Sequence, residues 1–563
     1  MSVEVDIPVS FNEVSLSQSS KKTGNSFVIF LAGFATIGGF LFGYDIGVIG
    51  GVKDMDTFRL VFDMPLRANC SLNSSLQTDE LRADCRHVEI TLGWIVGSFS
   101  LGCFGGALIA GVMSDKLGRR KTIISGGLMF VVGGSVQSAA VQIWMVFVGR
   151  VIAGVGVGVM SMVVPVYNAE VSPKDIRGRL VSLQQLSITA GIMVSFIVNL
   201  GCVHFEIGWR ISLGLQCVFA IILILGMIVL PESPRWLVKQ GFNSQAQCVL
   251  QQLRITRKSA KSDEIPSVVL DELQDIQEAV EMDKKMKPAT WRELLGPKLR
   301  KRMFVGFFIQ LFQQYTGMNV IMYYSTTLFG LIHVSEYVAT ALTGVINFLA
   351  TIAAVYLVDY AGRKVLLLCG SLGMAASVFL AAALLSPYTC SEGVDQTIGY
   401  IVTFLVCLFV INFAYGWGAT AWVVTSEIFP LRIREKAVSV TTSANWISNF
   451  SIAMCTPLLL DCDVLGVRGT FFLMGVFLTL SYIFVLFTTP ETKGKSLEHI
   501  DDLFTGRSWS EMSRWNYYLK CGCPWKVCRQ REYSVIEKLP LVAETPRTDE
   551  SEVTDTSSND VSV

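Results

Sequence analysis

The stretch AEVSPKDIRGR, residues 169–179, occurs again in altered form as SEIFPLRIREK at 426–436. Both copies carry the spacing Glu-x-x-Pro-x-x-x-Arg. The positive-inside rule explains why basic loops recur, but it explains neither the duplicated glutamate nor the duplicated proline. Two more pairs of motifs occur in the same order, which predicts two homologous halves. They are SDKLGRRK (114–121) with VDYAGRKV (358–365), and PESPRW (231–236) with PETKGK (490–495).

The composition is that of a membrane protein. Of 563 residues, 51% are hydrophobic and only 16% are charged, and the mean hydropathy is +0.49. Soluble domains carry about 25% charged residues. The formal net charge is zero, so nucleic-acid binding is not expected.

A helix needs about 20 apolar residues to cross a bilayer. The charged stretch 231–302 has helical spacing and few aromatic residues, which predicts soluble amphipathic helices. Twelve segments reach the length of a span: 27–51, 91–113, 122–141, 143–166, 181–202, 209–230, 303–329, 337–359, 364–385, 399–425, 436–459 and 468–488.

The predicted fold is an all-α membrane protein with twelve transmembrane helices in two pseudo-symmetric six-helix bundles and a cytoplasmic helical linker. The first 26 residues lack the features of a signal peptide, so the first span is expected to be retained. The expected parts are a cytoplasmic N-terminal tail (1–26), an N-terminal bundle (27–230, with an extracellular loop at 52–90), the linker (231–302), a C-terminal bundle (303–488) and a cytoplasmic C-terminal tail (489–563).

Lys and Arg cluster on one alternating set of loops, which predicts that these loops and both termini are cytoplasmic in a multi-pass plasma-membrane protein. The 52–90 loop is then extracellular. It contains two glycosylation sequons, at Asn69 and Asn73. Cys70 and Cys85 lie in the same loop and could form a disulfide in an oxidising compartment.

Several motifs occur in a fixed order along the chain: GRVIAGVGVG, PESPRW, QQYTGMN, YYST, SEIFP and PETKG. In this order they resemble the sugar porter family of the major facilitator superfamily, over about residues 40–500. The resemblance implies two bundles around a central site that opens alternately to each side, with a monosaccharide as the substrate. No nucleophile–base set or metal-ligand cluster occurs in the spans, so we expect neither an enzyme nor any metal or cofactor besides a coupling proton.

A sugar is neutral, with many hydroxyls and apolar C–H faces, so its site needs amides and aromatic side chains. Gln310, Gln313, Gln314 and Gly317 share one face of the predicted helix at 303–329, which can bend at Gly317. Asn445 and Asn449 share a face of the helix at 436–459, next to Trp446. By resemblance and by these patterns, the candidate sugar-binding residues are Phe42, Gln185, Gln313, Gln314, Asn319, Tyr323, Asn347, Phe413, Trp422, Asn445, Trp446 and Asn449. The alternative for each residue is interhelical hydrogen bonding or packing.

Asp45 lies in the first predicted span, in FLFGYDIGVIGG (40–51). A charge at mid-membrane costs about 2.5–3.5 kcal/mol on insertion scales, so it needs a partner or a proton. Arg150 in the span at 143–166 is the candidate partner. Proton-coupled sugar porters resemble the chain at both positions, and some facilitative members share the aspartate. We therefore predict sugar–proton symport, with a structural ion pair in a passive uniporter as the alternative.

Charged residues at the ends of the predicted spans form duplicated sets. By resemblance, these hold the cytoplasmic side shut in the outward-facing state, and solvated surface charge is the alternative. The candidate gate residues are Asp115, Arg119, Arg120, Glu170, Arg177, Glu232 and Arg235 in the first half, and Asp359, Arg363, Glu427, Arg434 and Glu491 in the second.

Three local features refine this hypothesis. GVGVGV (154–159) lies within a span and has no preceding strand, which indicates close helix packing and not a nucleotide loop. Where family members often have prolines, the chain reads Gly418-Ala419-Thr420-Ala421, so we expect a bend through Gly416 and Gly418. Ala414 stands where several relatives have an acidic residue, so the sequence does not determine which sugar is bound.

The partners expected are a monosaccharide and the lipid bilayer, with a monomer as the transport unit. YSVI (533–536) in the C-terminal tail fits a sorting pattern for trafficking adaptors, a pattern that also occurs by chance. The alternatives to hexose–proton symport are a facilitative hexose uniporter, a polyol or inositol transporter, and a sugar receptor that does not transport.

Overall fold

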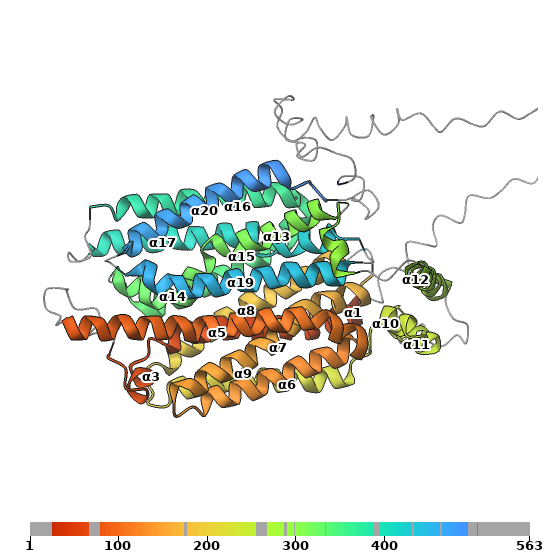
Figure 1. Ribbon diagram of the computed structural model, residues 1–563, viewed down its shortest axis with the longest axis horizontal. Coiled ribbons are helices and arrows are strands. Elements are labelled where there is room, and N and C mark those ends of the chain that lie inside the picture. Colours follow the sequence, from red (N-terminus) through yellow and green to blue (C-terminus); the bar gives the residue numbers. More distant parts are fainter. Residues whose placement is uncertain are drawn as a thin grey trace, which may run out of the picture. The chain divides into compact units, whose positions relative to one another are not determined.

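The computed structural model describes residues 25–66, 79–173, 177–254, 267–285, 290–297, 299–332, 334–387, 394–430, 433–461, 464–493 and 504, and in these residues every regular element is a helix (Figure 1). Asn69, Asn73, Cys70 and YSVI lie outside the described residues. So do the side chains of Arg177 and Asp359.

The first half of the chain contains six long helical segments, as predicted. The first segment is α1 (Asn25–Ala35) followed by α2 (Ile37–Val52), and the short α3 (Asp56–Val61) comes next. The others are α5 (Asp79–Leu117), α6 (Arg119–Ser138), α7 (Ile143–Val171), α8 (Arg177–Cys202) and α9 (Gly208–Val229).

The linker folds into short helices, as its periodicity predicts: α10 (Pro234–Lys239), α11 (Asn243–Arg254), α12 (Ser267–Lys285) and the 3₁₀ turn η2 (Trp291–Leu295). Helices α10 to α12 share a small apolar core that includes Leu237, Leu250 and Leu273. Two contacts attach this core to the bundle. Trp236 Nε1 donates to the Asp115 carbonyl (2.9 Å), and Arg254 Nη1 donates to the Val171 carbonyl (3.1 Å).

The second half repeats the pattern of the first. Its helices are α13 (Arg300–Tyr315), α14 (Met318–Leu331), α15 (Glu336–Ala361), α16 (Arg363–Leu384), α17 (Gln396–Phe413), the π-helical turn η3 (Ala414–Gly418), α18 (Thr420–Glu427), α19 (Arg434–Leu460) and α20 (Gly466–Thr488).

Glycines set the breaks between helices. Gly317 has φ +89° and separates α13 from α14, at the predicted bend, because the left-handed region is open to residues without a Cβ. Gly118 and Gly362 occupy equivalent positions before α6 and α16, with φ +90° and +92°. The π turn over 414–418 contains Gly416 and Gly418, so the helix departs from α geometry where the sequence predicts a bend.

The repeated glycines at 154–158 serve helix packing, as expected. A Cβ added to Gly154 would lie 2.2 Å from the Phe99 carbonyl oxygen of α5, and one added to Gly158 would lie 2.2 Å from that of Cys103. On the other side of α7, a Cβ on Gly156 would lie 2.4 Å from the Gly126 carbonyl of α6. Alternating glycines therefore let α7 approach two neighbours closely.

The two halves meet along two equivalent pairs of helices. Helix α5 packs against α19, and α8 packs against α15, the corresponding elements with the halves exchanged. Helices α2 and α14 also touch. We call the end from which α10 to α12 extend the linker end, and the opposite end, near α3 and the last turn of α14, the far end (Figure 1).

Within the described residues, nine helical stretches are long and apolar enough to cross a membrane. The segments at 119–138, 300–331 and 434–460 are less apolar or interrupted. Helix α6 (119–138) begins with Arg119, Arg120 and Lys121. Gly317 divides the segment at 300–331, and the segment at 434–460 carries a row of Ser, Thr and Asn. Two of these three segments supply the candidate site.

Candidate functional site

A cluster of amide side chains joins α13 to α19. Asn445 is its centre: Nδ2 donates to Gln310 Oε1 and Gln313 Oε1, both at 2.7 Å, and Oδ1 accepts from Gln314 Nε2 at 2.8 Å. Gln313 Nε2 donates to the carbonyls of Trp417 and Gly418, both at 3.0 Å. All four amides are at least 90% buried. They therefore face one another inside the protein and not the lipid.

The cluster continues into α14 and reaches the first half of the chain. Asn319 donates to Gln314 Oε1, and Asn449 Oδ1 accepts from Tyr323 (3.0 Å) and from Ser100 of α5 (2.7 Å). Ser100 was not predicted from the sequence, because nothing in its local pattern marks it. We call Gln310, Gln313, Gln314, Asn319, Asn445 and Asn449 the amide cluster.

Aromatic rings lie beside these amides. The Phe42 and Trp446 rings are 4.8 Å apart, and Phe99 lies 6.1 Å from Trp446, so rings of α2, α5 and α19 meet between the halves. A Cβ on Gly418 would lie 3.3 Å from Gln185 Nε2 and 3.4 Å from the Phe413 ring, which places these two side chains against the π turn. Asn347 of α15 is 2% exposed, and its Oδ1 has no hydrogen-bond partner.

Asp45 and Arg150 form an ion pair between α2 and α7. Arg150 Nη2 lies 3.2 Å from Asp45 Oδ2, and both side chains are fully buried. Arg150 Nε also donates to the Ile95 carbonyl (2.7 Å), and its guanidinium lies 5.1 Å from the Phe99 ring. Since Phe99 also contacts Trp446, the ion pair adjoins the aromatic side of the site.

Charged residues form a network at the linker end of the first half. Arg119 Nη2 lies 2.9 Å from Glu170, and Ser233 Oγ donates to the other oxygen of that carboxylate (2.5 Å). Glu232 accepts from the backbone N–H groups of Arg119 (2.9 Å) and Arg120 (3.1 Å). Burial raises the pKa of Glu232, against the effect of these donors.

The second half repeats this arrangement. Arg363 Nη2 lies 2.9 Å from Glu427, and Thr492 donates to the other oxygen of Glu427 (2.6 Å). Glu491 accepts from the backbone N–H groups of Arg363 and Lys364, both at 3.0 Å. Arg434 donates to the Phe429 carbonyl (3.2 Å), and the half-buried Arg235 lies at the start of α10. The structural repeat therefore extends to individual hydrogen bonds.

One ion pair at the linker end joins the two halves. Glu435, the second residue of α19, lies 2.6 Å from Arg119 Nη2. Asp115 lies beside Arg119 (3.9 Å) and pairs with Lys239 of the linker (2.9 Å). Glu435 precedes the predicted span 436–459, and burial raises its pKa to about 7. The sequence analysis missed Glu435, whose only signal is its place beside Arg434 in the repeated motif.

A second polar contact between the halves lies at the far end. Asp54, which follows α2, accepts from Thr326 (2.5 Å) and Thr327 (2.9 Å) of α14. Lys53 Nζ lies 2.9 Å from Asp54 and donates to Thr327 (2.8 Å). Lys53 and Asp54 are 0% and 6% exposed, so this contact is shielded from solvent. These residues were also absent from the prediction.

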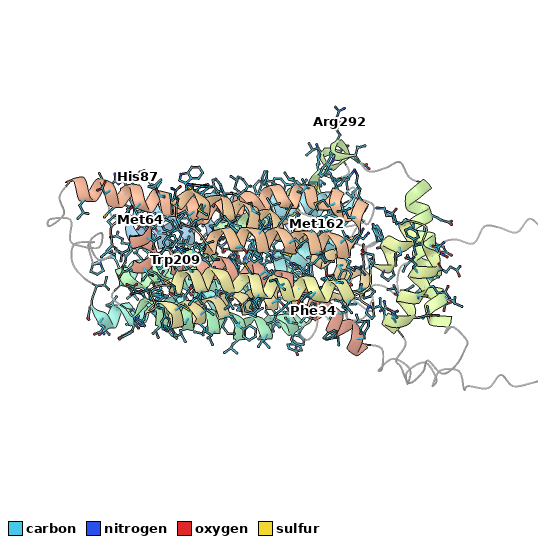
Figure 2. The ribbon with its side chains drawn as sticks, turned by 90° about the horizontal axis from the view of Figure 1, so that it is seen from below. Phe34, Met64, His87, Met162, Trp209 and Arg292 are labelled. Atoms are coloured by element: carbon cyan, nitrogen blue, oxygen red, sulfur yellow. The ribbon has the colours of Figure 1, made fainter. Side chains whose placement is uncertain are left out.

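A cavity lies on the linker side of the amide cluster, between the halves. It encloses about 520 Å³ of free space, the space at its open side included. Its lining includes Ser161 of α7, Ser182, Gln184 and Gln185 of α8, and Trp422 and Thr425 of α18. Figure 2 shows Met162, the neighbour of Ser161, in the part of the bundle nearer the linker helices, with Trp209 and His87 towards the far end.

The fold and site define a class of protein, a membrane transporter for a neutral, hydroxyl-rich solute. The features that define it are two duplicated halves, membrane-spanning helices and a buried, uncharged amide site between the halves. The chain matches the family model "Sugar (and other) transporter" over residues 31–504 and belongs to that family, which is a family of transporters and not of enzymes.

Individual relatives agree with this assignment. The chain is 34% identical to hexose transporter HXT10 of Saccharomyces cerevisiae, over 84% of each protein. It is also 34% identical to the high glucose sensor RGT2 of the same yeast, over 92% of this chain and 66% of the relative. Among solved structures, the proton:xylose symporter XylE of E. coli matches with a TM-score of 0.69 and 29% identity, covering 85% of this chain and all of XylE.

The predicted fold class is thereby confirmed: the protein is a multi-pass membrane protein with the twelve-helix fold of the major facilitator superfamily. The predicted disulfide stays a prediction. Cys85 takes part in a disulfide, but Cys70 lies outside the described residues. The glycosylation of Asn69 and Asn73 likewise stays a prediction.

Proposed function

We propose that the chain carries a hexose across the plasma membrane by alternating access, together with a proton. The observation that supports this most directly is the position of the Asp45–Arg150 pair. It is the one acid–base pair of the predicted sugar and coupling sites, it is fully buried, and it adjoins the rings that border the amide cluster.

The amide cluster suits a sugar because each amide both donates and accepts. In the arrangement described, these groups bond to one another, so a hexose would replace amide–amide bonds with amide–hydroxyl bonds at little net change in hydrogen bonding. The Phe42, Trp446 and Trp422 rings offer apolar surface to the C–H faces of the ring.

The proposed coupling follows from the ion pair. A proton on Asp45 neutralises the carboxylate and leaves Arg150 with the Ile95 carbonyl and the Phe99 ring as its partners. When Arg150 shifts, Phe99 shifts with it and displaces the Trp446 ring that it contacts. The neighbouring Ser100 transmits the same shift to Asn449, its hydrogen-bond partner. Release of the proton restores the pair and favours the sugar-free arrangement.

We assign the linker end to the cytoplasm, since the basic loops lie there. In this orientation, the Arg119–Glu435 pair holds the halves together on the cytoplasmic side, and the Asp54–Thr326 contact holds them together outside. Alternating access then requires that one contact breaks while the other forms. The duplicated Glu170 and Glu427 sites hold the helix ends within each half.

The test is uptake of radiolabelled D-glucose by proteoliposomes with an imposed proton gradient, with and without a protonophore. Wild type is expected to accumulate glucose above the outside concentration only while the gradient lasts. Asp45→Asn is expected to equilibrate glucose without accumulation. Uphill accumulation by Asp45→Asn would refute proton coupling through this residue and would require another group to carry the proton.

The similarity to RGT2 favours a second candidate, a sugar sensor that binds hexose without net transport. The same proteoliposomes separate the two functions. A sensor binds glucose with no flux in either direction, whereas a facilitative uniporter shows flux that never exceeds equilibrium. A panel of competing hexoses, pentoses and polyols, inositol among them, identifies the substrate.

A further inference from the structure

A cluster of charged residues lies at the far end, beside the contact between Asp54 and α14. Arg59 of α3 is its centre: Nη2 lies 3.1 Å from Glu89 Oε1 of α5 and 3.5 Å from Asp54 Oδ1. Lys53 Nζ lies 2.9 Å from Asp54 Oδ2. We call Lys53, Asp54, Arg59 and Glu89 the far-end charge cluster. Two cations and two carboxylates meet in it, so these four charges sum to zero.

Arg59 fixes the chain around α3 to the first half. Its side chain is 1% exposed, and Nε and Nη1 donate to the carbonyls of Lys53 and Pro65, both at 3.3 Å. Aromatic packing attaches α3 to α9 as well, because the Phe58 ring lies 5.4 Å from the Trp209 ring. Figure 1 shows α3 at the far end of this half. Arg59 therefore belongs to the first half and does not itself cross to the second.

The Asp54 carboxylate divides its two oxygens between the halves. Oδ1 faces Arg59 (3.5 Å), whereas Oδ2 accepts from Thr326 (2.5 Å) and Thr327 (2.9 Å) of α14. Lys53 contacts both sides, since Nζ donates to Asp54 Oδ1 (3.0 Å) and to Thr327 (2.8 Å). The contact between the halves thus depends on a carboxylate that cations of the first half orient.

The two threonines lie beyond an irregular point of α14. The helix departs from α geometry at Tyr324 (φ −124°, ψ 18°), and Thr326 and Thr327 follow this residue. Asn319 of the amide cluster precedes it. The last part of α14 can therefore leave Asp54 while the part that joins the amide cluster stays in place.

We propose that Arg59 is a positioning residue for the far-end contact. Its guanidinium orients the Asp54 carboxylate towards α14 and balances the charges of Asp54 and Glu89 while the contact excludes water. This proposal rests on the proposed function, because it takes the far end to open during transport. When α14 withdraws, water reaches Asp54 and screens its charge, so the balance matters less. Arg59 therefore stabilises the closed far end more than the open one.

The test measures the distance between α14 and the first half at the far end, in lipid nanodiscs and without sugar. Spin labels are placed at Val141 (67% exposed) and Leu331 (37% exposed) through a ketone-bearing amino acid, because the chain has 14 cysteines. Arg59→Met leaves the cluster with a net charge of −1 and is expected to increase the open population at least about tenfold. Adding Asp54→Asn restores a net charge of zero and is expected to reverse most of this increase.

The matched control is Arg210→Met. Arg210 of α9 also donates to a carbonyl, that of Ser138 (3.0 Å), and its guanidinium lies 4.3 Å from the Trp209 ring. Its contacts with described residues do not include an ion pair with the far-end charge cluster. We therefore expect Arg210→Met to leave the distance distribution unchanged.

Arg59→Lys covers the case in which Arg59→Met does not fold. It keeps the charge but loses the planar fork of donors, so it is expected to increase the open population about two- to tenfold, the effect of one hydrogen bond. Three results would each overturn the role of Arg59: an unchanged distribution in the Arg59 variant that folds, equal shifts in that variant and in Arg210→Met, or effects of Arg59→Met and Asp54→Asn that simply multiply. Because the measurement uses no sugar, wild type that transports no monosaccharide would overturn the proposed function alone.

Discussion

Replacing Asn445 with leucine removes the residue that the amide cluster shares. Three groups lose a partner: Gln310 Oε1, Gln313 Oε1 and Gln314 Nε2, which now lie 2.7, 2.7 and 2.8 Å from the Asn445 amide. A buried polar group without a partner costs about 1–3 kcal/mol, so three such groups cost about 3 kcal/mol or more. Because the glutamines also lose their fixed orientation, we expect glucose affinity to fall at least about tenfold.

Asn168→Leu is the matched control for this experiment. Asn168 of α7 is also fully buried, but neither atom of its amide has a hydrogen-bond partner, so its removal strands no other group. We expect Asn168→Leu to be neutral or stabilising. Both variants are purified in the same detergent, and their apparent melting temperature and D-glucose Kd are measured. Asn445→Leu that matches Asn168→Leu in both quantities would refute the role assigned to the amide cluster.

Three further predictions concern the contacts between helices and halves. Burial at the closed linker end outweighs the attraction of Arg119 and raises the pKa of Glu435 from 4.5 to about 7, so between these pH values the closed end holds a proton that the open end releases. Acid at that end should therefore favour closure by at most about tenfold per pH unit, and Glu435→Gln should abolish the dependence in spin-label distance measurements across the linker end. Gly158→Ala should prevent assembly, because its Cβ would lie 2.2 Å from a carbonyl of α5, whereas Gly105→Ala should express normally, since no atom lies within 4 Å of its Cβ; size-exclusion profiles that do not differ would contradict this. Asp54→Ala removes the acceptor of two threonine hydroxyls and should increase the population open at the far end by at least about tenfold, which double electron–electron resonance between α2 and α14 would detect; an unchanged distance distribution would count against it.

Much of the fold follows from local sequence. Apolar length predicted the spans, and the spacing of Gln310, Gln313 and Gln314 predicted one polar face, which the structure shows buried against α19. Gly317 was predicted as a bend and has φ +89°. Each of these features depends on residues within about two helical turns, so periodicity and backbone freedom are enough to reveal them.

The contacts between distant segments were not predictable in the same way. Ser100, Glu435, Asp54 and Thr326 belong to bonds that join residues hundreds of positions apart. Apart from the place of Glu435 beside Arg434 in the repeated motif, no local pattern marks them. Arg119 was predicted as a gate residue without named partners, and the structure pairs it with Glu170 in its own half and with Glu435 in the other half.

The sequence alone determined that the chain is a membrane protein of two related halves, which residues carry amides, and where the helices break. The tertiary structure decided which amides share one hydrogen-bonded cluster, which polar residues join the two halves at each end, and where free volume remains. The reason is physical. Helix formation and bilayer insertion depend on neighbours along the chain, whereas the partner of a buried polar group depends on how two independently formed bundles pack against each other.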